Sequence, residues 1–167
     1  MSNTDNEKIL LGYGVFKIAD VTIGLTRGGG TFEVEIDYRE VVADGDYGPV
    51  KGRVVKDREV GSLTINALTA FSKEQFLKYY PGLEEEAGKI TPTLNIKEGD
   101  YHKVTWVGKT MSGRPITIEM DNALNMEGIS LSLEDKNEVV PELKFTATYD
   151  PATRTKIPWS ITFGDGK

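Results

Sequence analysis

Two carboxylates stand one residue apart in residues 44–53, which read DGDYGPVKGR and form the most unusual stretch of the sequence. Asp44 and Asp46 suggest calcium chemistry, because calcium loops space their carboxylates in this way. An EF-hand loop that began at Asp44 would need an oxygen ligand at its fifth position, glycine at its sixth and glutamate at its twelfth. Gly48, Pro49 and Val55 occupy those positions. The spacing therefore excludes an EF-hand, and we expect no metal site.

The same residues also fail as a phosphate-binding loop. A Walker loop closes with Gly-Lys-Ser/Thr and leads into a helix, whereas Lys51 precedes Gly52 here and the following residues read as extended. The three glycines at residues 28–30 are followed by a strand pattern, unlike the glycines of a dinucleotide-binding loop, which open a helix. We therefore expect no cofactor.

Residues for catalysis are sparse. His102 is the only histidine, there is no cysteine, and Ser112 lies in a Ser-Gly turn that does not resemble a nucleophile elbow. A pair of carboxylates for glycoside cleavage cannot be singled out among 26 scattered acids. Trp106 and Trp159 lie in strand patterns at expected core positions, whereas a carbohydrate-binding platform would expose its aromatic rings. The sequence therefore favours a protein that is not an enzyme.

The length and the net charge of the chain further limit the class of protein to which it can belong. The chain has 167 residues and a net charge of −6. We expect one domain over residues 1–167, with residues 1–10 as a candidate flexible arm. An acidic protein does not clamp DNA phosphates, which takes clustered lysines and arginines. The start of the chain does not read as a signal peptide, and no segment approaches the roughly 18 apolar residues of a membrane span. We expect folding in the cytoplasm and no membrane insertion.

The elements that would position these side chains are mostly strands. Residues 31–42 alternate, with Phe32, Val34, Ile36 and Tyr38 on one face and Glu33, Glu35, Asp37 and Arg39 on the other. The same period of two predicts strands at residues 62–68, 104–106, 115–120, 129–133, 143–149 and 157–163. This pattern predicts a mainly β fold, a β-sandwich or partly rolled barrel of about eight strands.

One segment breaks the period of two. Ser72 and Gln75 have the spacing of a capping box, and Pro81 ends the short helix that follows. The fold should therefore carry one short flanking α-helix. The three glutamates at residues 84–86 read as a solvated turn.

Residues 43–56 form a long connection between two early strands. They are too polar and glycine-rich for a core, and they exceed the two to five residues of a simple hairpin loop. Lys51, Arg53 and Lys56 carry positive charge opposite Asp44 and Asp46. Long ordered loops on β folds often serve interfaces, so this arm is predicted to pair with another copy of the protein.

Four runs follow one another in a recognisable order. They are residues 24–32 (GLTRGGGTF) with the charged alternating strand, then DGDYGPVKGR, then the strand at residues 63–65 (LTI), and finally the Asp150-Pro151 turn with residues 157–161 (IPWSI). Together they resemble the major tail tube proteins of tailed bacteriophages. The resemblance spans most of the chain and consists of patterns, not of a catalytic signature.

That resemblance implies a structural virion protein. Tail tube proteins form hexameric rings that stack into the tube through which DNA is ejected, and one sheet of each β-sandwich joins a continuous inner barrel. The implied location is the virion tail, assembled in the host bacterial cytoplasm. The implied partners are further copies of the chain and the tape measure, tail tip and tail terminator proteins. DNA would pass transiently and without specific binding.

The resemblance also assigns roles to residues. An inter-subunit loop would contain Asp44, Asp46, Tyr47, Pro49, Lys51 and Arg53. The lumen of such tubes is typically acidic, which makes Glu33, Glu35 and Asp37 candidates to face it. Two alternatives stay open: the tube of a phage-like secretion or injection apparatus, and a carbohydrate- or receptor-binding β-sandwich module. A hydrolase is the least favoured reading.

Overall fold

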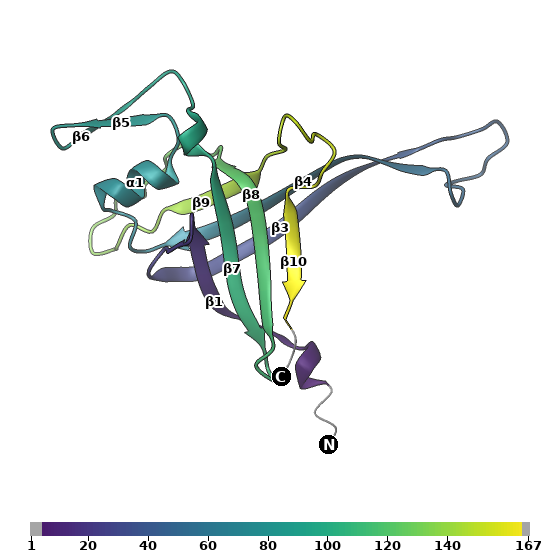
Figure 1. The fold of residues 1–167 in the computed structure, drawn as a ribbon, viewed down its shortest axis with the longest axis horizontal. Coiled ribbons are helices and arrows are strands. Elements are labelled where there is room, and N and C mark those ends of the chain that lie inside the picture. Colours follow the sequence, from purple (N-terminus) through teal and green to yellow (C-terminus); the bar gives the residue numbers. More distant parts are fainter. Residues whose placement is uncertain (1–4, 165–167) are drawn as a thin grey trace.

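The structure is a computed structural model, and it describes residues 5–164 (Figure 1). Its strands are β1 (Leu10–Ile18), β2 (Val21–Thr22), β3 (Thr26–Glu40), β4 (Val54–Ala67), β5 (Leu83–Glu86), β6 (Lys89–Pro92), β7 (His102–Thr110), β8 (Pro115–Asn125), β9 (Glu142–Ala147) and β10 (Trp159–Phe163). The helix α1 (Lys73–Tyr79) and the 3-10 turns η1 (Asn6–Lys8) and η2 (Glu98–Asp100) complete the described chain. The predicted mainly β, sandwich-like fold with one α-helix is confirmed, and its strands do not close into a barrel within the described residues.

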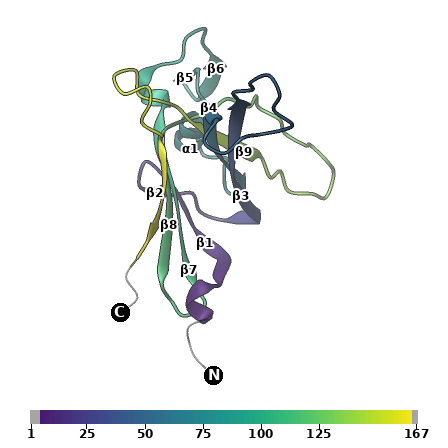
Figure 2. The ribbon, with the colours of Figure 1, turned by 90° about the vertical axis from the view of Figure 1, so that its right-hand side faces the viewer.

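Eight strands form one continuous antiparallel sheet, which folds at β8 into two layers. The first half of β8 lies between β7 and β10, and its last residues pair with β9, which continues to β4 and β3. We call β2-β1-β7-β8-β10 sheet one, and the end of β8 with β9, β4 and β3 sheet two. Asn122, with a positive φ of 50°, marks the bend between the two halves of β8. Figures 1 and 2 show sheet two crossing over one face of sheet one.

The core lies between the two sheets. Fully buried members come from both, including Val104 and Met120 of sheet one and Ile65, Leu143 and Phe145 of sheet two. The period of two explains this, because alternate residues of each strand face the opposing sheet. Strand β1 was not predicted, since it carries apolar residues or glycine on both faces and lacks the alternation.

The helix confirms its predicted start. The Ser72 Oγ accepts a hydrogen bond from the Gln75 amide at 3.2 Å. The hydrogen bonds of residues 5–164 do not include the reciprocal bond from the Ser72 amide to the Gln75 side chain, so only half of the capping box is present. Tyr79 and Tyr80 at the end of the helix are buried against the core. Burial raises the pKa of both phenols.

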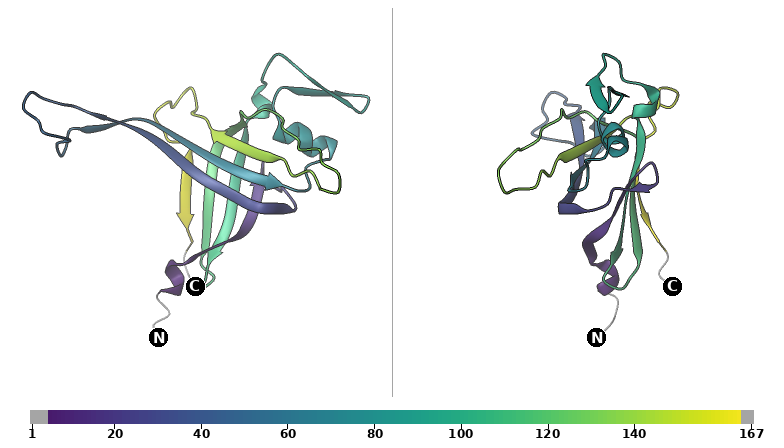
Figure 3. Two further views of the ribbon diagram at one scale, coloured as in Figure 1. Left: turned by 180° about the vertical axis from the view of Figure 1, so that it is seen from behind. Right: turned by 90° about the vertical axis from the view of Figure 1, so that its left-hand side faces the viewer.

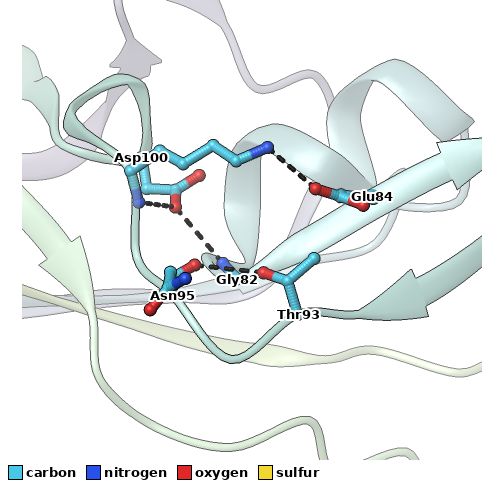
Figure 4. Close-up of polar contacts among 6 residues, drawn as sticks. Gly82, Glu84, Thr93, Asn95 and Asp100 are labelled. Atoms are coloured by element: carbon cyan, nitrogen blue, oxygen red, sulfur yellow. Dashed lines mark hydrogen bonds and ion pairs between the residues drawn. The ribbon is translucent and has the colours of Figure 1, made fainter.

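The prediction of a solvated turn at residues 84–86 is wrong. These glutamates belong to β5, which pairs with β6 in a separate hairpin. Ala87 and Gly88 both adopt positive φ, the backbone of a tight hairpin turn. Figure 4 shows the clasp at its base, where the Asp100 carboxylate accepts from the Gly82 and Lys97 amides at 3.3 and 2.8 Å.

The strand predicted at residues 129–133 is also absent. Strands β8 and β9 are joined by residues 126–141, which form no strand and for most of their length project beyond the sheets (Figure 2). Towards its end the segment returns to sheet two, where Glu138 pairs with Arg27 of β3 at 3.0 Å and Pro141 is buried. The side chains of residues 129–133 alternate as a strand requires, but no neighbouring strand of the described chain reaches them. The alternation of side chains predicts which residues could form a strand. It does not predict whether the free edge of another strand lies beside them.

The start of the chain is attached to the body where the structure describes it. Ile9 accepts a hydrogen bond from the Met111 amide at 2.9 Å, and Asn6 accepts one from the Ser112 amide at 3.3 Å. The candidate flexible arm at residues 1–10 is therefore held at the β7–β8 turn from Asn6 onward. Residues 1–4 lie outside the described residues.

Candidate assembly interface

The β3–β4 hairpin continues beyond the sheets as a projecting arm, which we define as residues 38–57 (Figures 1 and 3). Its strands stay paired from Tyr38 with Lys56 to Glu40 with Val54, and the Val41 amide donates to the Arg53 carbonyl at 2.9 Å. Residues 41–53 form the tip. The predicted connection at residues 43–56 thus ends earlier than expected, because β4 begins at Val54 and not near residue 62.

An ion pair inside the tip gives it a defined shape. The Asp46 carboxylate contacts the Arg53 guanidinium at 2.8 Å and accepts from the Ala43 amide at 2.8 Å. The Asp46 amide in turn donates to the Ala43 carbonyl at 3.1 Å. Gly45 and Gly52 hold the positive φ values of 91° and 86° that the reversals require. Two of the predicted interface charges therefore bind each other and shape the loop.

The remaining tip residues are presented to solvent. Tyr47 is fully exposed, and Val41, Val42 and Val50 are exposed as well. Asp44 and Lys51 form no ion pair among the described residues. Exposed tyrosine on a shaped apolar loop is typical of a contact surface, since tyrosine is enriched at the centres of protein interfaces.

Substitution of Asp46 by asparagine should loosen the tip alone. The amide oxygen bonds the Ala43 amide less strongly and loses the ion pair with Arg53, a loss of about 1 kcal/mol for partly exposed groups. Amide exchange in residues 41–53 should accelerate several-fold, measured by hydrogen–deuterium exchange, while the melting temperature falls by no more than about 2–4 °C. Asp44→Asn is the matched control, because Asp44 makes no hydrogen bond in the tip. Equal exchange in both variants would contradict a role of the Asp46 contacts in shaping the tip.

Sheet one has two free edges. The outer side of β10 has no partner strand among residues 5–164, and β2 covers only the end of β1 at Lys17 and Ile18. On β10, the Pro158 carbonyl and the Gly164 amide bond to β8 at 2.7 and 2.9 Å. Because backbone groups of alternate residues point to opposite sides of a strand, the amides of Trp159, Ile161 and Phe163 point away from β8. An exposed row of such groups is a template for another strand.

The acids predicted to face a lumen lie on one exposed face of β3. Glu33, Glu35 and Asp37 are exposed on β3, on the face of sheet two that points away from the core. Phe32, Val34 and Ile36 alternate with them on the core-facing side and are half-buried. The predicted alternation of residues 31–42 is therefore correct for this part of β3, but its charged face is separated from sheet one by the core.

The residues considered for catalysis are not brought together. His102 begins β7, where burial and the nearby charge of Lys78 lower its pKa. Ser112 follows the other end of β7, about 30 Å away at about 3.3 Å per residue, and bonds Thr110 at 3.0 Å. His102 lines a cleft with Asp121 and Asp150, and it makes no side-chain hydrogen bond to either carboxylate. No metal-binding cluster of three acidic or histidine side chains occurs in residues 5–164.

The two tryptophans face the interior. Trp106 is 7% exposed, and its ring lies so close to Gly14 and Gly108 that a Cβ at either position would clash with it. Trp159 is half-buried and packs edge-on against Phe32 with a centroid distance of 5.6 Å. The core positions predicted for both are supported, and neither ring forms an open platform for a sugar.

Sequence reasoning missed the free edges of sheet one and the root of the arm. A cleft of about 630 Å³ lies at this root, lined by Lys56, Glu59, Tyr149 and Arg154 among others. Glu59 is buried there and paired with Lys56 at 3.1 Å, and the Tyr149 hydroxyl donates to the Glu59 carbonyl at 2.8 Å. These bonds fix the direction in which the arm leaves the sheet. Residues of β4, of β9 and of the loops that follow β8 and β9 build this cleft, so no local motif predicted it.

No model of a known protein family matches the chain, and no curated protein matches it. Within residues 5–164, no helix is both long and apolar enough to cross a membrane.

Proposed function

We propose that the protein is a structural subunit that assembles into hexameric rings and that these rings stack into the tail tube of a bacteriophage. The observation that carries the proposal is the combination of an arm whose tip makes no hydrogen bond to the body of the described chain and a sheet with two free edges. A monomer gains nothing from either feature. Both are explained if a second copy covers them.

The strand directions support a ring. Each neighbouring pair in sheet one is antiparallel, so β10 runs opposite to β1. The β1 edge of one copy can therefore pair with the β10 edge of the next and continue the antiparallel order. Such contacts are heterologous, and repetition of one rotation closes them into a ring that leaves no free edge.

The exposed face of sheet one would then line the lumen. The cross-strand register places on this face Tyr13, Val15, Lys17, Lys103, Thr105, Val107, Lys109, Thr117, Glu119, Ser160 and Thr162. Lys103 and Glu119 form an ion pair across it at 2.6 Å, which raises the pKa of Lys103. In this arrangement hydroxyl groups, the Lys103–Glu119 ion pair and two lysines without an ion pair among the described residues, Lys17 and Lys109, line the passage for DNA, while Glu33, Glu35 and Asp37 lie on the outer wall.

Substitution of Ile161 by proline tests the contact that forms the ring without disturbing the fold of the monomer. The Ile161 amide points to the free edge, so Ile161→Pro removes an outward donor and spares the ladder to β8, where proline is tolerated only on an edge. We expect a folded monomer that fails to form rings, measured by circular dichroism and sedimentation velocity. Ile161→Val is the matched control and should assemble. Normal rings from Ile161→Pro would rule out pairing at this edge.

A further inference from the structure

We infer that residues 129–133 (ISLSL), which form no strand within one chain, add as a β-strand to the free outer edge of β3 in a second copy of the protein. The inference rests on the self-assembly proposed above and names the partner surface of one contact. It concerns sheet two and is separate from the β1–β10 contact of sheet one.

The segment has the chemistry of a strand and no partner in its own chain. Ile129, Leu131 and Leu133 alternate with two serines, and Ile129 and Leu133 are 49% and 78% exposed. No hydrogen bond in the described chain uses the backbone of residues 128–133. Leucine and isoleucine side chains that stay exposed at alternate positions contribute no free energy of apolar burial. Pairing of the segment with a sheet edge would bury them and gain that free energy.

The outer edge of β3 is the complementary template. Strand β3 pairs with β4 on one side, and no strand of residues 5–164 covers its other side. Phe32, Val34 and Ile36 form a half-buried apolar row, and Glu33 and Glu35 alternate with them on the opposite face. The five residues of the segment match these five positions one for one.

When the apolar face of the segment lies on the same side as the apolar face of β3, each side chain of the segment lies beside a side chain of matching polarity. When Leu131 lies opposite Val34, the three apolar residues of the segment extend the row of Phe32, Val34 and Ile36. The two serines then lie beside Glu33 and Glu35, where their hydroxyls can donate to the carboxylates. This centred register holds for either strand direction.

Charge excludes the simplest competitor, which is β3 pairing with itself in a two-fold dimer. Two β3 strands in register would place Glu33, Glu35 and Asp37 of one copy among the same acids of the other, and like charges directly opposite are destabilising. The segment ISLSL carries no charge. An uncharged partner is therefore preferred on this edge.

Single-cysteine cross-linking tests the contact, since the chain has no cysteine of its own. Leu131→Cys protein is mixed with Val34→Cys protein, concentrated until it assembles, and oxidised. Directly opposite residues bring their Cβ atoms within disulfide range. In an equal, randomly mixed assembly only about half of the chains can meet a suitable partner, and we expect the mixed covalent dimer, identified by mass spectrometry, to approach that fraction. Leu131→Cys mixed with Lys109→Cys is the control and should give almost none.

A backbone variant gives an independent readout. No hydrogen bond in the described chain uses the Leu131 amide, so Leu131→Pro should leave the monomer folded. It should raise the concentration needed for half-assembly at least ~10-fold, equivalent to ~1.4 kcal/mol. Leu131→Ile keeps the strand pattern and should behave as the parent.

The outcomes separate this inference from the proposed function. Rings that form without the mixed cross-link would overturn the contact and leave the ring intact. The mixed cross-link in irregular oligomers would support the contact and contradict the ring. Disulfides only between two Leu131→Cys chains would overturn the assignment to β3, and protein that stays monomeric throughout would contradict both proposals.

Discussion

Replacement of residues 41–53 by Asn-Gly should leave a stable monomer that no longer builds tubes. Glu40 and Val54 are directly paired, and a two-residue Asn-Gly turn is the favoured link between such positions. The tip makes its hydrogen bonds within itself, so its loss should change the melting temperature by little. Electron microscopy and sedimentation velocity should show the loss of stacked assemblies.

Point variants at Tyr47 refine this result. Tyr47 is the most exposed aromatic residue of the tip, and truncation of an interface tyrosine commonly costs about 2 kcal/mol or more of association. Tyr47→Ala should therefore weaken assembly roughly 30-fold or more, at about 1.4 kcal/mol per tenfold. Tyr47→Phe keeps the ring and should retain most of the assembly. Full assembly by the shortened arm would show that the tip makes no essential contact.

The second large effect concerns the core, where Phe145→Ala should strongly destabilise the monomer. Phe145 is 1% exposed and lies between the two sheets. Its truncation leaves a cavity that typically costs about 3–5 kcal/mol, which corresponds to a fall in melting temperature of about 10 °C in a chain of this size. Chemical denaturation of dilute protein measures the change in the free energy of unfolding.

Phe71→Ala is the matched control for this substitution. Phe71 is 55% exposed and contacts mainly Phe76, with a centroid distance of 6.1 Å. Its loss should cost under about 1 kcal/mol, because little apolar area leaves water there on folding. A similar loss of stability in both variants would contradict the position of the core between sheets one and two.

The strands that the sequence predicted correctly are those with one buried face. Residues 31–36 alternate because Phe32 and Val34 face the core while Glu33 and Glu35 face solvent. Strand β1 was not predicted because both of its faces carry apolar residues or glycine, and at Gly14, which makes room for the Trp106 ring, the inner face has no side chain that would reveal the alternation. Strand β5 was not predicted because its adjacent glutamates resemble a solvated turn, although glutamates are tolerated on an exposed hairpin.

The sequence predicted which residues form the candidate interface arm, but it did not predict how those residues contact one another. The spacing of residues 44–53 excluded an EF-hand and a Walker loop and indicated an arm, and the arm is present. The pairing of Asp46 with Arg53 depends on how the loop folds back, which spacing alone does not specify. The free edges of β1, β3 and β10 depend on strand order, a property of the whole chain that no local pattern contains.

The central claim is tested most directly by negative-stain electron microscopy of the concentrated, unmodified protein. The account predicts six-fold rings and tubes of uniform diameter, because the β1 and β10 edges repeat one contact around an axis and the arm links successive rings. A field of monomer-sized particles at the highest attainable concentration would contradict it, as would two-fold dimers that do not grow.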